Sequence, residues 1–90
     1  MKLEETGLTF EDIKEKVNKY MIETYERMDF LAESAKDQYI YNEKGEKYLD
    51  FYAGIAVNSA GSCNEKVVKA VVDQAQTLMH TFNYPYTIPQ

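Results

Sequence analysis

The 90-residue sequence contains no tryptophan, one cysteine, one histidine and two prolines, and it has no long apolar run. A single cysteine, Cys63, cannot form an internal disulfide, which favours a reducing, cytoplasmic compartment. A single histidine, His80, excludes a metal site or a catalytic dyad built from histidines. No run reaches the roughly 18 apolar residues of a membrane span, and residues 1–25 lack the apolar stretch of a secretory signal. We therefore expect neither a membrane helix nor a signal peptide.

Basic residues are outnumbered, since ten Lys and Arg stand against fifteen Asp and Glu and give a net charge of −5. Nucleic-acid binding draws its affinity from clustered Lys and Arg, so we expect no nucleic-acid partner. The eight tyrosines could in principle stack on bases. Without a basic groove, however, they are better explained by packing in a core or an interface.

The acidic residues are unevenly distributed, because thirteen of the fifteen lie in residues 1–50. The last forty residues are mainly apolar and aromatic, and those near the end are Phe82, Tyr84, Tyr86 and Ile88. This gradient predicts a truncated chain. The alternative is a complete small domain whose last helix docks on its core and is followed by a short aromatic tail. Either way, a chain of this length buries little more than half of its unfolded surface.

The first segment with helical periodicity covers residues 9–25. Thr9 and Asp12 have the spacing of a capping box, in which a hydroxyl and an acid satisfy the free amides of the first turn. The apolar residues that follow at three- and four-residue spacings are Phe10, Ile13, Val17, Tyr20 and Met21. They predict an amphipathic helix with a polar face of alternating Glu and Lys.

The period changes to that of β-structure between residues 30 and 51. Tyr39–Tyr41 and Tyr48–Phe51 are aromatic and favour strands, and the turn at 43–46 between them contains Gly45, which can adopt positive φ. We predict an antiparallel hairpin here. Because two strands alone are marginal in water, either residues 30–36 add a third strand or a helix covers one face.

A connection with small residues over 52–63 leads to a second helix at 65–80, where Asn64 is the expected N-cap and Glu65 suits the positive helix end. The apolar stripe of this helix is Val68, Val71, Val72, Ala75, Leu78 and Met79. Because valines are modest helix formers, we expect burial to stabilise it. The sequence thus predicts an α+β chain: helix 9–25, antiparallel sheet 30–51, connection 52–63, helix 65–80 and aromatic tail 81–90.

No residue stands out as catalytic or metal-binding. His80 is expected in the last turn of the second helix, where an imidazole suits the negative helix end. Cys63 precedes a helix N-terminus, which can activate a thiol, but no base lies near it in sequence, so a small buried residue is the favoured interpretation. Gly54 and Gly61 precede a helix but match neither the dinucleotide nor the Walker spacing.

Several motifs, taken in order, resemble the N-terminal region of class III pyridoxal-phosphate aminotransferases of the acetylornithine and 4-aminobutyrate type. They are an aromatic strand at Tyr39–Tyr41, an acid-x-Gly turn at Glu43–Gly45, Tyr48-Leu-Asp-Phe51, Gly54-Ile-Ala-Val-Asn58, and the segment His80-Thr-Phe-Asn-Tyr-Pro-Tyr86 with Pro89-Gln90 beyond it. The resemblance covers residues 36–90, and residues 9–35 are compatible with it. One departure is Gly61-Ser-Cys-Asn-Glu65, where the family usually has Gly-His-x-His-Pro. Asn64 and Glu65 are sound helix-start residues, so we expect the geometry to survive while any polar role of the histidines is lost.

The resemblance implies the N-terminal part of the minor domain of a fold-type I aminotransferase, which works as a cytoplasmic homodimer. It implies transfer of an amino group from acetylornithine or a related ω-amino acid to a 2-oxo acid such as 2-oxoglutarate, as in arginine biosynthesis, with pyridoxal 5'-phosphate as cofactor. In the family pattern the Schiff-base lysine and the phosphate loop lie beyond residue 90. The chain alone is therefore expected to be inactive and to hold no catalytic, cofactor or metal residue. Ile55 and Tyr86 match substrate-pocket walls.

A second hypothesis comes from a different class of protein. The chain could be a small non-enzymatic interaction domain that binds a protein partner through its aromatic C-terminal segment. A reading frame that continues past Gln90 and carries a lysine-bearing segment would favour the enzyme.

Overall fold

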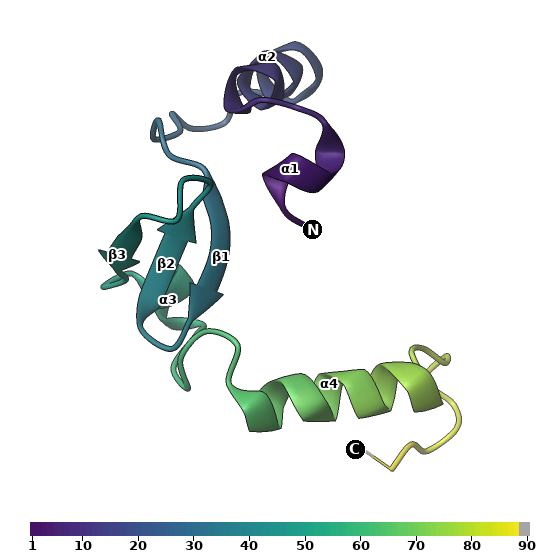
Figure 1. Cartoon of the computed structure of the whole chain (residues 1–90). Coiled ribbons are helices and arrows are strands. Elements are labelled where there is room, and N and C mark those ends of the chain that lie inside the picture. Colours follow the sequence, from purple (N-terminus) through teal and green to yellow (C-terminus); the bar gives the residue numbers. More distant parts are fainter. Residues whose placement is uncertain (89–90) are drawn as a thin grey trace.

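The computed structural model describes residues 1–88, in which helices flank a small antiparallel sheet (Figure 1). The elements are α1 (Leu3–Thr6), α2 (Phe10–Tyr20), β1 (Ala32–Lys36), β2 (Tyr39–Asn42), β3 (Lys47–Leu49), α3 (Ala53–Ala56) and α4 (Glu65–Thr77). This confirms the α+β class. The last two residues of the expected aromatic tail, Pro89 and Gln90, lie outside the described residues.

The sheet has three strands in the order β1-β2-β3, and both pairings are antiparallel. Of the two alternatives for the hairpin, the structure therefore has the third strand, which is β1. Ile40 in the central strand pairs with Ala35 on one side and with Tyr48 on the other. The Tyr48 ring also meets the ring of Phe30 edge to face, with centroids 5.0 Å apart. Such aromatic pairs add stability beyond the area that they bury.

The β2–β3 turn is organised by Asn42, one of the two buried polar residues of the described chain. The Asn42 Oδ1 atom accepts hydrogen bonds from the amides of Lys44 (3.1 Å) and Glu46 (2.8 Å), and its Nδ2 donates to Glu46 Oε2 at 2.6 Å. Gly45 has φ +77°, as the turn chemistry predicts. The hydrogen bonds from Asn42 and Tyr48 hold the pKa of Glu46 below its usual value, which keeps this acceptor charged.

Helix α2 begins as expected but ends earlier than expected. The Asp12 amide donates to Thr9 Oγ1 (3.1 Å) and the Thr9 amide donates to Asp12 Oδ2 (2.7 Å), so the capping box is confirmed. The helix ends at Tyr20, not near Tyr25, because Met21 is already extended. The chain then turns back along the helix, where Lys14 Nζ bonds to Asp29 Oδ1 at 2.9 Å. Residues of the returning segment, such as Tyr25 and Met28, line one groove together with Ile13 and Val17 of the apolar stripe.

Apolar burial is low throughout the described residues, where no hydrophobic side chain is buried. The accessible surface is 8341 Å², whereas a compact monomer of this mass would expose about 5,400 Å². The radius of gyration is 17.1 Å, compared with about 12 Å for a compact chain of this length. Figure 1 shows why: α4 extends away from the sheet, and the yellow tail lies at its far end.

The expectation that burial stabilises the second helix is therefore wrong for this chain. No residue of α4 is buried, because no other element of residues 1–88 packs extensively against it. Across these residues, no helix is long and apolar enough to cross a membrane.

Candidate functional site

The connection between the sheet and α4 is joined to the β1–β2 turn by backbone hydrogen bonds. Asp37 and Ser62 form an isolated antiparallel bridge, with N···O distances of 2.8 and 2.7 Å. The neighbouring Gly61 has φ +83°, and a Cβ atom added there would lie 3.1 Å from the Asp37 Cα. This close approach of two backbones requires glycine. The bridge fixes where α4 starts relative to the sheet.

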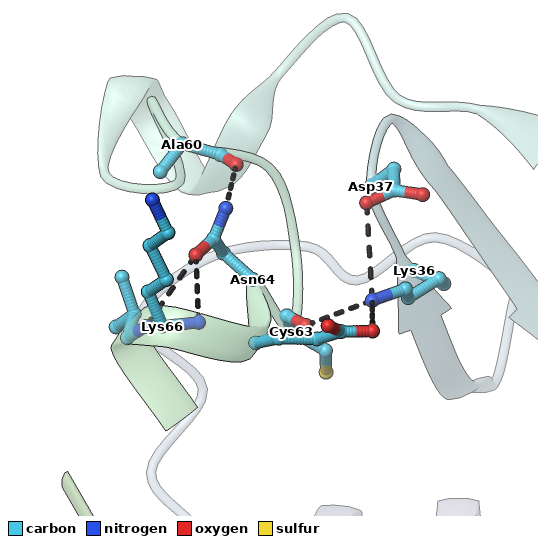
Figure 2. Close-up of polar contacts among 8 residues, drawn as sticks. Lys36, Asp37, Ala60, Cys63, Asn64 and Lys66 are labelled. Atoms are coloured by element: carbon cyan, nitrogen blue, oxygen red, sulfur yellow. Dashed lines mark hydrogen bonds and ion pairs between the residues drawn. The ribbon is translucent and has the colours of Figure 1, made fainter. Parts of the chain in front are cut away.

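Asn64 caps the first turn of α4, as predicted (Figure 2). Its Oδ1 accepts from the amides of Lys66 (3.1 Å) and Val67 (3.4 Å), and its Nδ2 donates to the Ala60 carbonyl at 3.3 Å. Asparagine thus satisfies free amides of the helix end at the point where the family motif usually carries a histidine. The departure from that motif leaves the helix start intact.

Lys36 closes the same junction from the β1 side. Its Nζ donates to the Cys63 carbonyl at 3.2 Å and lies 3.9 Å from Glu65 Oε1 (Figure 2). The prediction that Cys63 is buried is wrong, because its thiol is exposed. The backbone explains this: Cys63 has φ +52° and is anchored through its carbonyl, so that its side chain faces outward.

The segment labelled α3 is a left-handed turn. Gly54 and Ile55 have φ/ψ of 61°/38° and 57°/57°. Ala53 and Ala56 also have positive φ, at 47° and 62°. Each non-glycine residue in this region costs about 1–2 kcal/mol, and for a β-branched residue such as Ile55 it is a clear outlier. Strain of this kind persists only where the surroundings enforce it, and it is concentrated at functional sites.

Asp50 is the residue that supports this turn. Its Oδ1 accepts hydrogen bonds from the amides of Tyr52 and Ala53, both at 2.9 Å. The turn is closed further on by the Asn58 amide, which donates to the Ala53 carbonyl at 2.9 Å. Sequence reasoning placed Asp50 in a strand motif and assigned it no role. The available signal was an acid directly before a chain reversal, where aspartate commonly accepts from amides two or three residues ahead.

The two predicted pocket residues do not meet in this chain. Ile55 lies on the left-handed turn and is 81% exposed, and Tyr86 lies in the tail and is 99% exposed. Figure 1 shows α3 beside the sheet, whereas the tail leaves the far end of α4 and turns back below that helix. A 13-residue helix such as α4 is about 20 Å long. Both side chains are available for contacts, but together they form no site within residues 1–88.

His80 is not in the last turn of α4, so that prediction is wrong. The helix ends at Thr77, because Leu78 is extended with φ −159° and ψ 107°. Side chains cap this end: Thr77 Oγ1 donates to the Asp73 carbonyl at 2.8 Å, and Gln74 Nε2 donates to the Leu78 carbonyl at 2.7 Å. His80 therefore lies beyond the end of α4, between the helix and the tail, and not in the last helical turn.

Comparison with known proteins identifies the family. The sequence profile described as aminotransferase class-III matches residues 20–89, which is well over half of the chain. The chain belongs to the class-III aminotransferases.

Relatives with curated names support this membership. The acetylornithine aminotransferase of Methanocaldococcus jannaschii is 49% identical over 72 residues, which are 80% of this chain and 18% of that protein. The acetylornithine aminotransferase of Archaeoglobus fulgidus is 38% identical over 76 residues, or 84% of this chain and 20% of that protein. The chain thus spans about a fifth of the length of the curated relatives that it matches.

Solved structures agree on the fold. The ornithine aminotransferase from Toxoplasma gondii ME49 superposes with a TM-score of 0.83 at 26% identity, over 93% of this chain and 20% of that one. The acetylornithine aminotransferase from Elizabethkingia anophelis gives a TM-score of 0.82 at 24% identity, over 88% of this chain and 20% of that one. At the lower identity, the likeness shows the fold alone.

Class-III aminotransferases use pyridoxal phosphate, and the described residues do not fit that cofactor. An aldimine-forming lysine needs a sheltered site in which its amine can lose its proton. None of the lysines is buried. The Lys14 ammonium donates hydrogen bonds to the carboxylates of Glu11 and Asp29, which raises the pKa of Lys14 and favours the unreactive ammonium form. Residues 1–88 also hold no group of His, Cys, Asp and Glu that could bind a metal ion.

Proposed function

We propose that the chain is the N-terminal part of a pyridoxal-phosphate-dependent aminotransferase. The enzyme moves an amino group from acetylornithine or a related ω-amino acid to a 2-oxo acid such as 2-oxoglutarate. The observation that carries this proposal is the 49% identity to an acetylornithine aminotransferase over 80% of the chain. The cytoplasm as compartment and a homodimer as working state belong to the same proposal.

In this proposal the chain supplies substrate-pocket edges and no catalytic centre. Two findings support the division: the chain spans about a fifth of its relatives' length, and none of its lysines is sheltered as an aldimine would need. The cofactor's lysine and phosphate loop come from further polypeptide. The surface of 8341 Å² supports this as well, since it exceeds that of a compact monomer by about 2,900 Å² and leaves a large area for that polypeptide to cover.

Ile55 and Tyr86 are proposed as walls of the substrate pocket. Their exposure of 81% and 99% fits residues whose contacts are made outside this chain. In the complete enzyme, Tyr86→Ala should raise KM for the amino substrate more than it lowers cofactor content, because a pocket wall contributes binding and not the aldimine bond. Loss of bound cofactor at a normal KM would remove Tyr86 from the pocket.

A second candidate is a free-standing interaction domain, favoured by one observation. The tail carries a cluster of exposed apolar side chains: Phe82, Tyr84, Tyr86 and Ile88. The rings of Phe82 and Tyr84 meet edge to face with centroids 5.6 Å apart, so that two members of the cluster contact each other. Exposed apolar patches of several hundred Å² commonly mark interaction surfaces.

The decisive experiment compares two proteins. The first is the product of the longest reading frame that contains these residues, assayed with acetylornithine and 2-oxoglutarate. The second is the 90-residue chain with pyridoxal phosphate, followed by borohydride trapping and peptide mapping. We expect transamination by the first, and only scattered lysine labelling without transamination by the second. A reading frame that stops at Gln90, or stoichiometric labelling of one lysine in the chain, would refute the division of roles.

A further inference from the structure

The left-handed turn is part of a loop whose two ends are held by adjacent residues. The Asp50 amide donates to the Gln38 carbonyl at 2.8 Å, and Ser62 is bridged to Asp37 by two backbone hydrogen bonds. Residues 50–62 therefore leave and return at the same β1–β2 turn. Loops with such close ends are compact and are frequently functional.

Within this loop, Asp50 links the fixed end to the strained turn. Its backbone amide donates to the carbonyl of Gln38, next to the sheet. Its carboxylate accepts hydrogen bonds from the amides of Tyr52 and Ala53, at 2.9 Å each. Both bonds involve an ionised acceptor, which makes them stronger than neutral ones. Ala53, whose amide is one of the two, is the first residue of the left-handed turn, and Ile55 follows two residues later. Asp50 is thus placed to decide the backbone conformation that presents Ile55.

We propose that Asp50 is a positioning residue for the substrate pocket. It touches no substrate itself, but its carboxylate holds residues 53–56 in the left-handed conformation and so fixes Ile55 as a pre-formed pocket wall. The inference rests on the proposed function, because the role of Ile55 in the pocket belongs to it. Without the carboxylate, only a fraction of molecules presents Ile55 correctly, and apparent substrate affinity falls by that fraction.

The test uses the complete enzyme with three variants. Asp50→Ala removes the acceptor, Asp50→Asn keeps an oxygen that can accept both amides, and Asp73→Ala is a matched control because Asp73 is an exposed acid of α4 that pairs with Lys69. We expect Asp50→Ala to raise KM for the amino substrate about tenfold, with kcat and cofactor content within about threefold of the parent. Asp50→Asn should recover most of that loss, and Asp73→Ala should change neither constant.

A second readout follows the conformation directly. In the 90-residue chain, a residue with positive φ gives a strong intraresidue Hα–HN nuclear Overhauser effect, and Ile55 should lose it in Asp50→Ala but keep it in Asp50→Asn. An unchanged KM in Asp50→Ala, or equal losses in kcat and KM with loss of cofactor, would overturn the positioning role. If the unmodified long protein does not transaminate, the proposed function fails and the pocket role fails with it. The signal at Ile55 then still decides whether Asp50 holds the turn.

Discussion

Replacing Gly61 by alanine tests how the sheet and α4 are joined. Two costs add at this position. The first is the left-handed backbone, with φ +83°, which costs an alanine about 1 kcal/mol or somewhat more. The second is steric, since the new Cβ would lie 3.1 Å from the Asp37 Cα and 3.4 Å from its carbonyl carbon and oxygen. These are backbone atoms, which cannot rotate away as a side chain would.

The steric cost can be scaled from the bridge that it disturbs. Asp37 and Ser62 share two hydrogen bonds of 2.8 and 2.7 Å, and each contributes about 0.5–1.5 kcal/mol. Moving Gly61 away by a few tenths of an ångström weakens both. We therefore expect Gly61→Ala to destabilise the junction by about 2–4 kcal/mol in total.

Gly45→Ala is a matched control, because Gly45 has a similar φ of +77° but no atom within 4 Å of an added Cβ. It should show the backbone cost alone, about 1 kcal/mol. The assay is amide hydrogen exchange of Asp37 and Ser62 in the 90-residue chain, with Asn42 and Glu46 amides reporting on the hairpin. Gly61→Ala should speed exchange at Asp37 and Ser62, and Gly45→Ala should speed it only in the hairpin. Equal effects of the two variants at Ser62 would refute the close-approach argument.

Three further predictions use the same chain. Gly45→Val should weaken the hairpin by about 1 kcal/mol or more, because a β-branched residue resists positive φ; an unchanged unfolding midpoint would contradict this. Deleting residues 81–90 should reduce self-association in sedimentation experiments, because it removes exposed apolar side chains such as Phe82 and Tyr84; equally monomeric proteins would argue against the tail as an interface. Hydrogen bonds from Thr9 lower the pKa of Asp12 below its usual 3.8. The capping contribution is therefore present above that pH and is lost as the pH falls through the lower folded value, so helicity measured by circular dichroism should decline there. In Asp12→Asn this acid-dependent step should be absent.

The features that the sequence predicted correctly depend on local chemistry. The capping box of Thr9 and Asp12, the N-cap of Asn64 and the positive φ of Gly45 each involve atoms within four residues of one another. Such contacts form in the same way wherever the segment lies, so spacing alone indicates them. The family resemblance rested on the same kind of signal, a series of short motifs in order, and the match over residues 20–89 confirms it.

The features that the sequence missed depend on segments far apart in the chain. Helix α2 ends at Tyr20, and the chain then returns so that Lys14 bonds to Asp29. Periodicity cannot show where such a later segment will lie. The left-handed turn that carries Ile55 follows Asp50, whose carboxylate accepts from nearby amides of the turn and whose own amide donates to the carbonyl of Gln38 in the β1–β2 turn. Neither alanine nor isoleucine favours that backbone. A search based on propensity therefore misses this turn, although an acid directly before a chain reversal is a local sign of it.

The exposed apolar face of α4 indicates, from helix energetics, that this helix is suited to packing against further polypeptide. At 100° per residue, its four valines and Ala75 fall within an arc of about 140°, wider than the stripe of a typical surface helix needs to be. The residues of this arc are Val67, Val68, Val71, Val72 and Ala75. An isolated helix of about 12–15 residues is marginal in water even with the best helix formers, and four of the 13 residues of α4 are valines. Covering the apolar arc would therefore add much of the stability that a helix of this composition lacks by itself. Because no element of residues 1–88 covers it extensively, the sequence of α4 is suited to a surface supplied by further polypeptide of the proposed enzyme.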